Sequence, residues 1–370
     1  MSAEELTEYL ESWFPRGAAW EKDNVGLQIG SRGNRIKNIM ICLELTDEVL
    51  KDAINKNCNF IFTHHPLLFN PVKKLDFHSN QTSQLIEKII KHDITVYSAH
   101  TNLDFVKDGV SFELAKRLKL KNICFLKNQE ANQFKVVVFV PENYLEQVSN
   151  AAFSAGAGII GEYSSCSFRI KGEGTFKGSE KTNPAIGSKN VFEKVEEIRL
   201  EFIVDEWNLS NVISAILKVH PYEEPAYDIY HVKNKNVNYG AGAIGYLENK
   251  MDENEFLYHI SKSLNTEAIK YCNGKNRVIN KVAVCGGSGA SLIDDAINSG
   301  ADAFITADIK YHEFHSANNR IMLIDAGHYE TEVLILDAVK KKIENFIGKK
   351  SNLKVYKYNK STNPIKFYKH

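Results

Sequence analysis

The sequence predicts an α/β fold in which two related α/β halves form one domain, interrupted by an α+β insert. Three observations predict it. Helix-then-strand segments near the two ends of the chain resemble each other, apolar strands near both ends lead into polar or glycine-rich sequence, and the middle of the chain follows a different rhythm. A length of 370 residues also exceeds what one hydrophobic core usually serves, so more than one domain is expected.

An internal similarity connects the two ends of the chain. Residues 52–63 read DAINKNCNFIFT and residues 295–306 read DAINSGADAFIT, and both segments end a strand on threonine. Residues 94–100 (ITVYSAH) correspond in the same way to residues 321–328 (IMLIDAGH), each a short apolar strand that leads to histidine. Helix-strand units share composition, so chance agreement stays open, but two related halves are the preferred interpretation.

The middle of the chain predicts a self-contained domain. Its expected elements are a strand at 134–141, a helix at 142–157, an edge strand or hairpin at 161–176, a strand at 196–204, a helix at 209–219 and a strand at 226–232. This β-α-β-β-α-β order is the ferredoxin-like pattern. We therefore place an insert at 127–245, which divides the outer domain into residues 1–126 and 246–370. The glycine-rich residues 238–245 (NYGAGAIG) are expected to form the return linker.

Composition excludes several classes of protein. Lys plus Arg equals Asp plus Glu at 46 each, so the basic excess of a dedicated nucleic-acid binder is missing and nucleic acid is not an expected partner. The amino-terminal segment is acidic and amphipathic, unlike a secretory signal, and no apolar run approaches the roughly 20 residues of a membrane span. The six cysteines form no CxxC pair and are expected to be buried thiols of a reducing compartment. A cytoplasmic location is therefore expected.

Polar sequence follows five apolar strands of the expected outer domain. The five junctions read FIFT-HH, VYSA-HTNLD, VAV-CGGSG, AFIT-AD and LIDA-GHYETE. In open α/β sheets, ligands bind at the carboxyl ends of the strands. Because five such ends point the same way, we expect them to form one pocket.

The adjacent residues His64 and His65 come first in this pocket. Side chains of neighbouring residues point to opposite sides of a strand, but just past its end, with Pro66 fixing the turn, both rings are able to face one space. The alternative is one buried and one surface histidine, which is the commoner situation for an isolated pair.

Two further clusters share one spacing. His100 and Asp104, like His328 and Glu332, place a carboxylate four residues after a histidine, so that a helix would put both groups on one face. Ordinary surface pairs use the same spacing, and each cluster alone is weak evidence. Three histidine-bearing strand ends with two carboxylates, in a chain of twelve histidines, together favour a metal site.

The ligand set suggests two ions. Six nitrogen and oxygen ligands, namely His64, His65, His100, Asp104, His328 and Glu332, exceed what one tetrahedral zinc needs. Two divalent ions per subunit account for the surplus, with Asp104 and Glu332 as the bridging candidates because a carboxylate has two oxygens. Such ligands accept several metals, of which Zn, Fe and Mn are foremost.

Other motifs near the strand ends leave alternatives open. Residues 285–291 (CGGSGAS) either cradle a phosphate or another anion with backbone amides, or form a plain tight turn. Thr306, Asp308, Tyr311 and His312 are expected to orient ligands or substrate, although Asp308 and His312 also suit a capped helix start with a surface histidine. Residues 23–27 (DNVGL) form a loop over the site or merely a turn.

The motifs, taken in order, resemble those of a known family. The matching segments are DNVGLQIG (23–30), FTHHPLLF (62–69), AHTNLD (99–104), GGSGAS (286–291), TADIKYHEF (306–314) and GHYETE (327–332). The chain resembles the GTP cyclohydrolase 1 type 2 homologues, also called NIF-three-like dinuclear metal-centre hexamer proteins. The resemblance places the family's metal ligands on the same six residues.

The same resemblance has implications for fold, assembly and activity. It implies two related halves with a PII/CutA-like insert, and a homohexamer built as a trimer of dimers. The family label implies a metal-dependent hydrolase that opens the guanine imidazole ring of GTP and releases formate. The competing hypothesis is a non-catalytic metal-binding, metal-handling or regulatory hexamer, and the sequence assigns no catalytic residue in either case.

Overall fold

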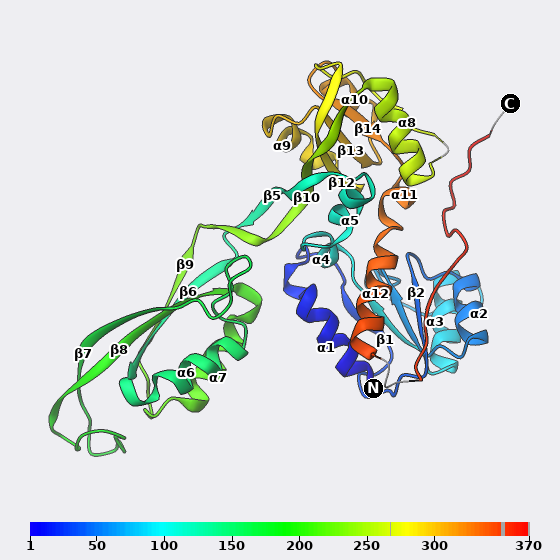
Figure 1. The fold of residues 1–370 in the computed structure, drawn as a ribbon. Helices are drawn as coiled ribbons and strands as arrows, with labels where there is room; N and C mark the ends of the chain where they lie inside the picture. Colours follow the sequence, from blue (N-terminus) through cyan, green and yellow to red (C-terminus); the bar gives the residue numbers. More distant parts are fainter. Residues whose placement is uncertain (267, 349–351, 369–370) are drawn as a thin grey trace. The chain divides into compact units, whose positions relative to one another are not determined.

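The computed structural model describes residues 1–266, 268–348 and 352–368 (Figure 1). The chain divides into two compact units: an outer unit, Met1–Lys127 with Tyr239–His370, and an insert unit, Asn128–Asn238. The chain leaves the outer unit along β5 (Lys121–Glu130) and returns to it along β10 (Lys235–Asp252). Among the described helices, none combines the length and apolar character that crossing a membrane requires.

The first sheet of the outer unit is mainly parallel. Its strand order is β1-β4-β3-β2-β15, with β15, β2, β3 and β4 parallel and β1 antiparallel to β4. The strands are β1 (Gly26–Ile29), β2 (Ile39–Cys42), β3 (Phe60–Thr63), β4 (Thr95–Ser98) and β15 (Val355–Lys357). Strands β2, β3 and β4 are buried at every residue, as expected of a parallel sheet covered on both faces.

Helices cover both faces of this sheet. Ile39 and Ile41 of β2 pack in a core with α1 (Ala3–Trp13) and α12 (Ile335–Ile347), which lie side by side in Figure 1. Met40 and Cys42, on the opposite face of β2, pack in a core with α2 (Asp47–Asn55) and α3 (Gln81–Lys91). Alternate side chains of β2 therefore pack in two separate cores, one on each face of the sheet.

The second sheet of the outer unit has the order β11-β14-β13-β12-β10-β5. Its further strands are β11 (Lys270–Tyr271), β12 (Val278–Ser288), β13 (Ala303–Ala307) and β14 (Met322–Asp325). Strands β12, β13 and β14 are parallel, while β11 is antiparallel to β14. In both sheets an antiparallel strand, β1 or β11, thus lies beside a run of parallel strands, four in the first sheet and three in the second.

Helices also cover both faces of the second sheet. Helices α5 (Val110–Arg117) and α8 (Glu253–Leu264) share one core with the strands, and α9 (Ile293–Asn298) and α10 (Tyr311–Ala317) share the other. The remaining helical elements are short: α4 (Thr101–Asp104), α11 (His328–Glu332) and the 3-10 turns Arg16–Ala18, Glu142–Tyr144, Glu206–Asn208 and Ala290–Leu292. Helix α11 contains His328 and Glu332, whereas α4 ends with Asp104 and directly follows His100.

The insert unit contains one antiparallel sheet with two helices on one face. Its elements are β6 (Gln133–Pro141), α6 (Leu145–Ser154), β7 (Phe168–Lys177), β8 (Phe192–Asp205), α7 (Leu209–Val219) and β9 (Tyr227–Val232). The strand order is β7-β8-β6-β9, and α6 and α7 lie side by side (Figure 1). The elements follow the predicted order, except that residues 161–167 form turns and β8 begins earlier than expected.

The predicted linker at residues 238–245 is wrong, because these residues lie within β10. Their glycines permit a close approach of β5. A Cβ on Gly240 would lie 2.6 Å from the carbonyl oxygen of Lys127, and one on Gly245 would lie 2.8 Å from that of Lys121. Glycine in a strand often marks such an approach of another backbone, whereas the composition alone suggested a flexible link.

The expectation for the cysteines holds only in part. Cys42 and Cys58 are buried, but Cys124 is exposed, and the other three are of intermediate exposure. All six are free thiols. Cys124 is exposed because it lies in β5, a strand at the edge of its sheet.

We expect residues 128–238 to fold when expressed alone, because their strands and helices enclose a core of their own. Denaturation followed by circular dichroism should show one cooperative transition. Leu200→Ala, at a fully buried core position, should lower the free energy of unfolding by about 2–5 kcal/mol. Ile170→Ala, at an exposed position of the same sheet, should change it by less than about 0.5 kcal/mol. A gradual transition that neither substitution shifts would show that this segment depends on the outer unit.

Candidate metal centre

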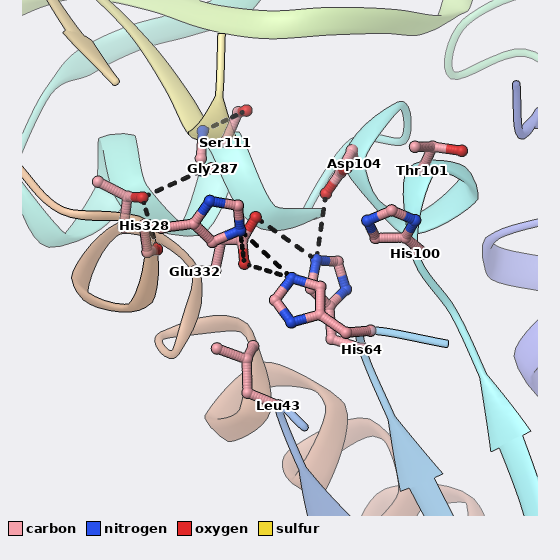
Figure 2. A network of polar contacts seen from close by, with 12 residues as sticks. Leu43, His64, His100, Thr101, Asp104, Ser111, Gly287, His328 and Glu332 are labelled. Atoms are coloured by element: carbon pink, nitrogen blue, oxygen red, sulfur yellow. Dashed lines mark hydrogen bonds and ion pairs between the residues drawn. The ribbon is translucent and has the colours of Figure 1, made fainter. Parts of the chain in front are cut away.

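The structure brings the six predicted side chains together at the carboxyl ends of strands from both sheets of the outer unit. His64 and His65 follow the last residue of β3, and His100 precedes α4 just after β4. His328 begins α11 after β14, and Glu332 ends the same helix. Figure 2 shows the side chains of His64, His100, Asp104, His328 and Glu332 gathered in one place. Their ligand atoms form two groups able to hold a metal ion, His64-His65-His100 and His65-His328-Glu332.

His64 is the most deeply buried of the histidines. Its side chain is fully buried, and Nδ1 donates a hydrogen bond of 2.7 Å to the carbonyl oxygen of Ala99. This bond fixes the ring so that Nε2 faces two carboxylates, 3.7 Å from Asp104 Oδ1 and 3.9 Å from Glu332 Oε1. These distances are too long for direct hydrogen bonds.

Two polar atoms at this point have no hydrogen-bond partner among the described residues. They are His64 Nε2 and Asp104 Oδ1, and both are buried. A buried polar atom without a partner costs about 1–3 kcal/mol, so native proteins seldom keep one unless a water or an ion completes it. Since a neutral imidazole nitrogen and a carboxylate oxygen are both metal ligands, the pair suits a divalent cation between them.

Asp23 orients His100. The Nδ1 atom of His100 lies 3.0 Å from each oxygen of the Asp23 carboxylate, which also accepts hydrogen bonds from the backbone amide and hydroxyl of Thr101. Burial by itself raises the pKa of Asp23, but the bonds from His100 and Thr101 outweigh it and lower the pKa to about 2. The ionised carboxylate keeps the proton of His100 on Nδ1 and leaves Nε2 free for a metal. Of residues 23–27, Asp23 is thus part of the site, while Gly26 and Leu27 begin β1.

The second group contains His65, His328 and Glu332. The Oε2 atom of Glu332 lies 2.9 Å from His65 Nε2 and 3.1 Å from His328 Nε2, and the two ring nitrogens are 3.4 Å apart. The two contacts of Glu332 Oε2 are at ion-pair distances, and this atom has no hydrogen-bond partner among the described residues. Each ring donates its Nδ1 proton to another carboxylate, His65 to Glu44 Oε1 at 3.0 Å and His328 to Asp308 Oδ2 at 2.6 Å. A histidine held by a carboxylate in this way is typical of metal sites.

Glu332 lies between the two groups. Its carboxylate is almost fully buried, with Oε1 facing His64 in the first group and Oε2 facing His65 and His328 in the second. One oxygen directed to each group is the arrangement that a bridging carboxylate requires. Asp104, the other bridging candidate, approaches His64 of the first group.

The electrostatics of the site favour bound positive charge. Burial raises the pKa of Glu332, but its contacts with His328, His64 and His65 outweigh burial and hold that pKa well below its ordinary value. Burial lowers the pKa of His65 and of His328, but the neighbouring carboxylates raise them to about 10 and about 9. Burial raises the pKa of Asp104 to about 6. The carboxylates therefore attract cations, and metal ions would replace protons in this role.

Gly287 makes room for Glu332. It has a φ of +62°, in the left-handed region, and a Cβ there would lie 2.0 Å from Glu332 Oε1. Its amide donates to the hydroxyl of Thr331 at 3.0 Å, and the amide of Gly286 donates to that of Ser111 at 3.3 Å. Because protein oxygens already use both amides, these two do not form the anion cradle that the glycine-rich segment suggested.

The residues expected to orient ligands behave differently from one another. Asp308 contacts His328 as described, and Thr306 donates a hydrogen bond of 2.9 Å to the carbonyl oxygen of Gly287. Asp308 has a φ of +58° and precedes α10, so it does not share a helical face with His312. Tyr311 is exposed, and its ring lies edge-on to His312.

Sequence reasoning missed Glu44 entirely and left Asp23 undecided. Neither lies at a fixed spacing from the histidine that it orients, since Glu44 precedes His65 by 21 residues and Asp23 precedes His100 by 77. The only available signal for Glu44 was its place as a polar residue shortly after the apolar run IMIC, which forms β2 and was not among the predicted strands.

The comparisons with known proteins agree over nearly the whole chain. The model of the Duf34/NIF3 (NGG1p interacting factor 3) family matches residues 1–364. A GTP cyclohydrolase 1 type 2 homolog of Halalkalibacterium halodurans is 38% identical over 365 residues, which cover 98% of each chain. The homolog of Bacillus subtilis is 36% identical over 370 residues, covering 99% of each. The crystal structure of a Bacillus cereus protein related to NIF3 superposes with a TM-score of 0.85 at 37% identity, covering 100% of this chain and 99% of that one. The chain therefore belongs to the Duf34/NIF3 family, as its motifs predicted.

Proposed function

We propose that the chain binds two divalent metal ions and uses them to hydrolyse a nucleotide. The observation that carries the proposal is the convergence of six nitrogen and oxygen ligands around buried atoms that have no hydrogen-bond partner among the described residues. Four of these ligands are imidazoles whose other nitrogen binds a protein oxygen, so that the free nitrogen faces the centre. This donor chemistry fits Zn, Fe or Mn.

The contacts divide the ligands between two positions. His64, His100, Asp104 and Glu332 Oε1 would hold the first ion, and His65, His328 and Glu332 Oε2 would hold the second. His65 is close enough to belong to either group. We assign it to the second because its Nε2 lies beside His328 Nε2 and 2.9 Å from Glu332 Oε2.

The partial exposure of the site favours catalysis over storage. Side chains of His65, His100, Asp104 and His328 are 24%, 20%, 22% and 33% exposed, so one side of the centre meets solvent. Structural zinc sites are closed, whereas catalytic sites keep a position open. Bound divalent ions would supply a Lewis acid and lower the pKa of a water to near neutrality. The chain's own contribution is to hold the ligands, with Asp23, Glu44 and Asp308 fixing the ring orientations.

GTP is the proposed substrate because relatives carry the name GTP cyclohydrolase 1 type 2 homolog. The corresponding reaction adds water at C8 of guanine and opens the imidazole ring to a formamide, which a second water then hydrolyses with release of formate. The alternative is a centre that binds metal without turning over substrate, as a metal-handling or regulatory element. The ligands of a reactive ion and of a stored ion are of the same types, so the site alone does not distinguish the two hypotheses. Turnover of substrate does.

The architecture and assembly form a second part of the proposal. The shared arrangement of one antiparallel strand beside a run of parallel strands supports two related halves in the outer unit. The order β7-β8-β6-β9 with two helices on one face supports a ferredoxin-like, PII/CutA-like insert. We also propose a homohexamer, a trimer of dimers. Exposed apolar side chains on the insert unit, including Tyr163, Phe168, Phe192 and Tyr230, are what a self-associating protein needs.

Metal content tests the centre directly. After loading with Zn²⁺ and desalting, the wild-type protein should hold two ions per chain by elemental analysis. Glu332→Ala should hold less than one, because its oxygens face both positions, and His328→Ala should retain about one. His315→Ala, on the exposed side of α10, is the matched control and should retain two. A folded wild-type protein that binds no ion would refute the proposal.

Product analysis tests the catalytic part. Protein loaded with Zn, Mn or Fe should release formate from GTP, and Glu332→Ala should not. Asp308→Asn should reduce the rate about 10–100-fold, because the orienting carboxylate of His328 is lost. His315→Ala should be as active as the wild type. If metal-loaded protein forms no product with any of these ions, the non-catalytic alternative is correct.

Light scattering coupled to gel filtration tests the assembly. The purified full-length chain should have the mass of a hexamer. Replacing the exposed Phe168 and Phe192 with serine should give smaller species, since the apolar surface that drives association is reduced. Replacing the exposed lysines Lys250 and Lys275 instead should not change the mass. A monomeric wild-type protein at micromolar concentration would contradict the proposed hexamer.

A further inference from the structure

The carboxyl-terminal residues 358–368 contact the surroundings of the second metal position. They follow β15 and contain neither helix nor strand, and Figure 1 shows them as an extended trace beyond β15. We call residues 358–368 the tail. Its backbone is attached to the first sheet at its start, where the amide of Tyr358 donates to the carbonyl oxygen of Ile41 at 2.9 Å.

The tail makes its first contact through Thr362. The Thr362 hydroxyl donates a hydrogen bond to Glu44 Oε2. The other oxygen of that carboxylate, Oε1, accepts the Nδ1 proton of His65 at 3.0 Å. Glu44 is 32% exposed, so without Thr362 its carboxylate is free to turn toward water. A chain of two hydrogen bonds thus runs from the tail to a metal ligand.

The second contact is made by the next residue. Asn363 Nδ2 donates to Glu330 Oε1 at 3.0 Å. Glu330 belongs to α11, between the ligands His328 and Glu332. Its other oxygen folds back on the start of the helix, where a Cβ on Gly327 would lie 2.2 Å away. The tail therefore holds α11 by a side chain located between two ligands of the second position.

Both contacts concern the same position. Thr362 acts on His65, and Asn363 acts on the helix that carries His328 and Glu332, so together they reach all three ligands of the second ion. The first position is oriented by other groups. Its histidines donate to Ala99 and Asp23.

Local hydrogen bonds shape the tail around these two residues. The amide of Asn363 donates to Ser361 Oγ at 3.1 Å, and the amide of Ile365 donates to Asn363 Oδ1 at 3.0 Å. The apolar side chains of Ile365 and Phe367 stay exposed. The tail, α11 and α12 line a cavity of about 870 Å³, so the tail does not fill the space beside these helices. Polar contacts at 361–363, with little apolar burial beyond them, hold this part of the tail in place.

We propose that Thr362 is a positioning residue that sets the affinity of the second metal position without affecting the first, and that Asn363 supports the same position through α11. This inference rests on the proposed two-metal centre. The physical basis is that a carboxylate orienting a ligand histidine contributes to metal affinity, and its loss typically costs 10–100-fold. Thr362 fixes that carboxylate for His65, and Asn363 restrains the backbone that carries the other two ligands.

The test is a titration of the metal-free, full-length protein with Zn²⁺ in competition with a chromophoric chelator. The wild type should show two binding steps. Thr362→Val, which removes the hydroxyl at nearly constant volume, should weaken one step by about tenfold and leave the other unchanged. Thr362→Ser should restore it, and Thr362→Val with Asn363→Leu should weaken the same step further.

Two controls identify the step. Lys360→Ala changes an exposed side chain of the same tail and should bind as the wild type does. Asp23→Asn should weaken the other step, because Asp23 orients His100 in the first position. Thermal unfolding of the metal-free variants should match the wild type, which separates a loss of affinity from a loss of fold.

Each remaining outcome is decisive. If the wild type binds two ions and Thr362→Val binds both as tightly, the role of the tail is refuted while the two-metal centre stands. If Thr362→Val weakens both steps equally and lowers the unfolding temperature, the tail is merely structural and the inference is also wrong. A wild type that binds no zinc removes the centre itself, and this inference with it.

Discussion

The rest of the outer unit depends on one buried carboxylate, that of Glu332. A buried charge is tolerated only where opposite charge or hydrogen-bond donors surround it. The side chains that surround Glu332 come from distant segments, His64 and His65 from the end of β3 and His328 from the start of α11. Strand β3 belongs to the first sheet, and α11 follows β14 of the second sheet. The environment of Glu332 therefore exists only when both sheets are formed and joined, and Gly287 leaves the space that this carboxylate occupies.

The two sheets place these residues because their parallel strands are buried on both faces. Full burial keeps β3, β4 and β14 rigid up to their last residues, so the side chains that follow have defined starting points. Short helices then follow and bring carboxylates beside imidazoles, since α4 ends with Asp104 and α11 ends with Glu332. A ring nitrogen at the centre is useful only when the other is fixed, and Asp23, Glu44 and Asp308 fix three of the four rings from loops outside the strands.

The sequence predicted the parts of this arrangement that follow from local periodicity. Apolar runs ending in His64 and His100, and the four-residue spacing of His328 and Glu332, are readable because strand ends and helical turns are local features. Glu44 escaped because its partnership with His65 depends on how β2 lies beside β3, which no local spacing encodes. The glycines of β10 were misread for a related reason. Composition is the same for a flexible linker and for a strand that needs another backbone close by, and only the pairing distinguishes them.

The two groups of proposed ligands differ in how much of the chain must be ordered to complete them. His64 is held by Ala99, 35 residues away, on the neighbouring strand end of the same sheet. His65 is held by Glu44, whose second oxygen is held by Thr362 across 318 residues of sequence. Closing a long loop costs only modestly more entropy than closing a short one. The energetic difference between the contacts that orient His64 and those that orient His65 therefore lies mainly in the segments that hold them. The contact of His64 ends in a buried sheet, at Ala99. The contacts of His65 end, through Glu44, in the partly exposed tail, at Thr362. The second group is accordingly the one whose geometry responds to changes at the surface of the protein.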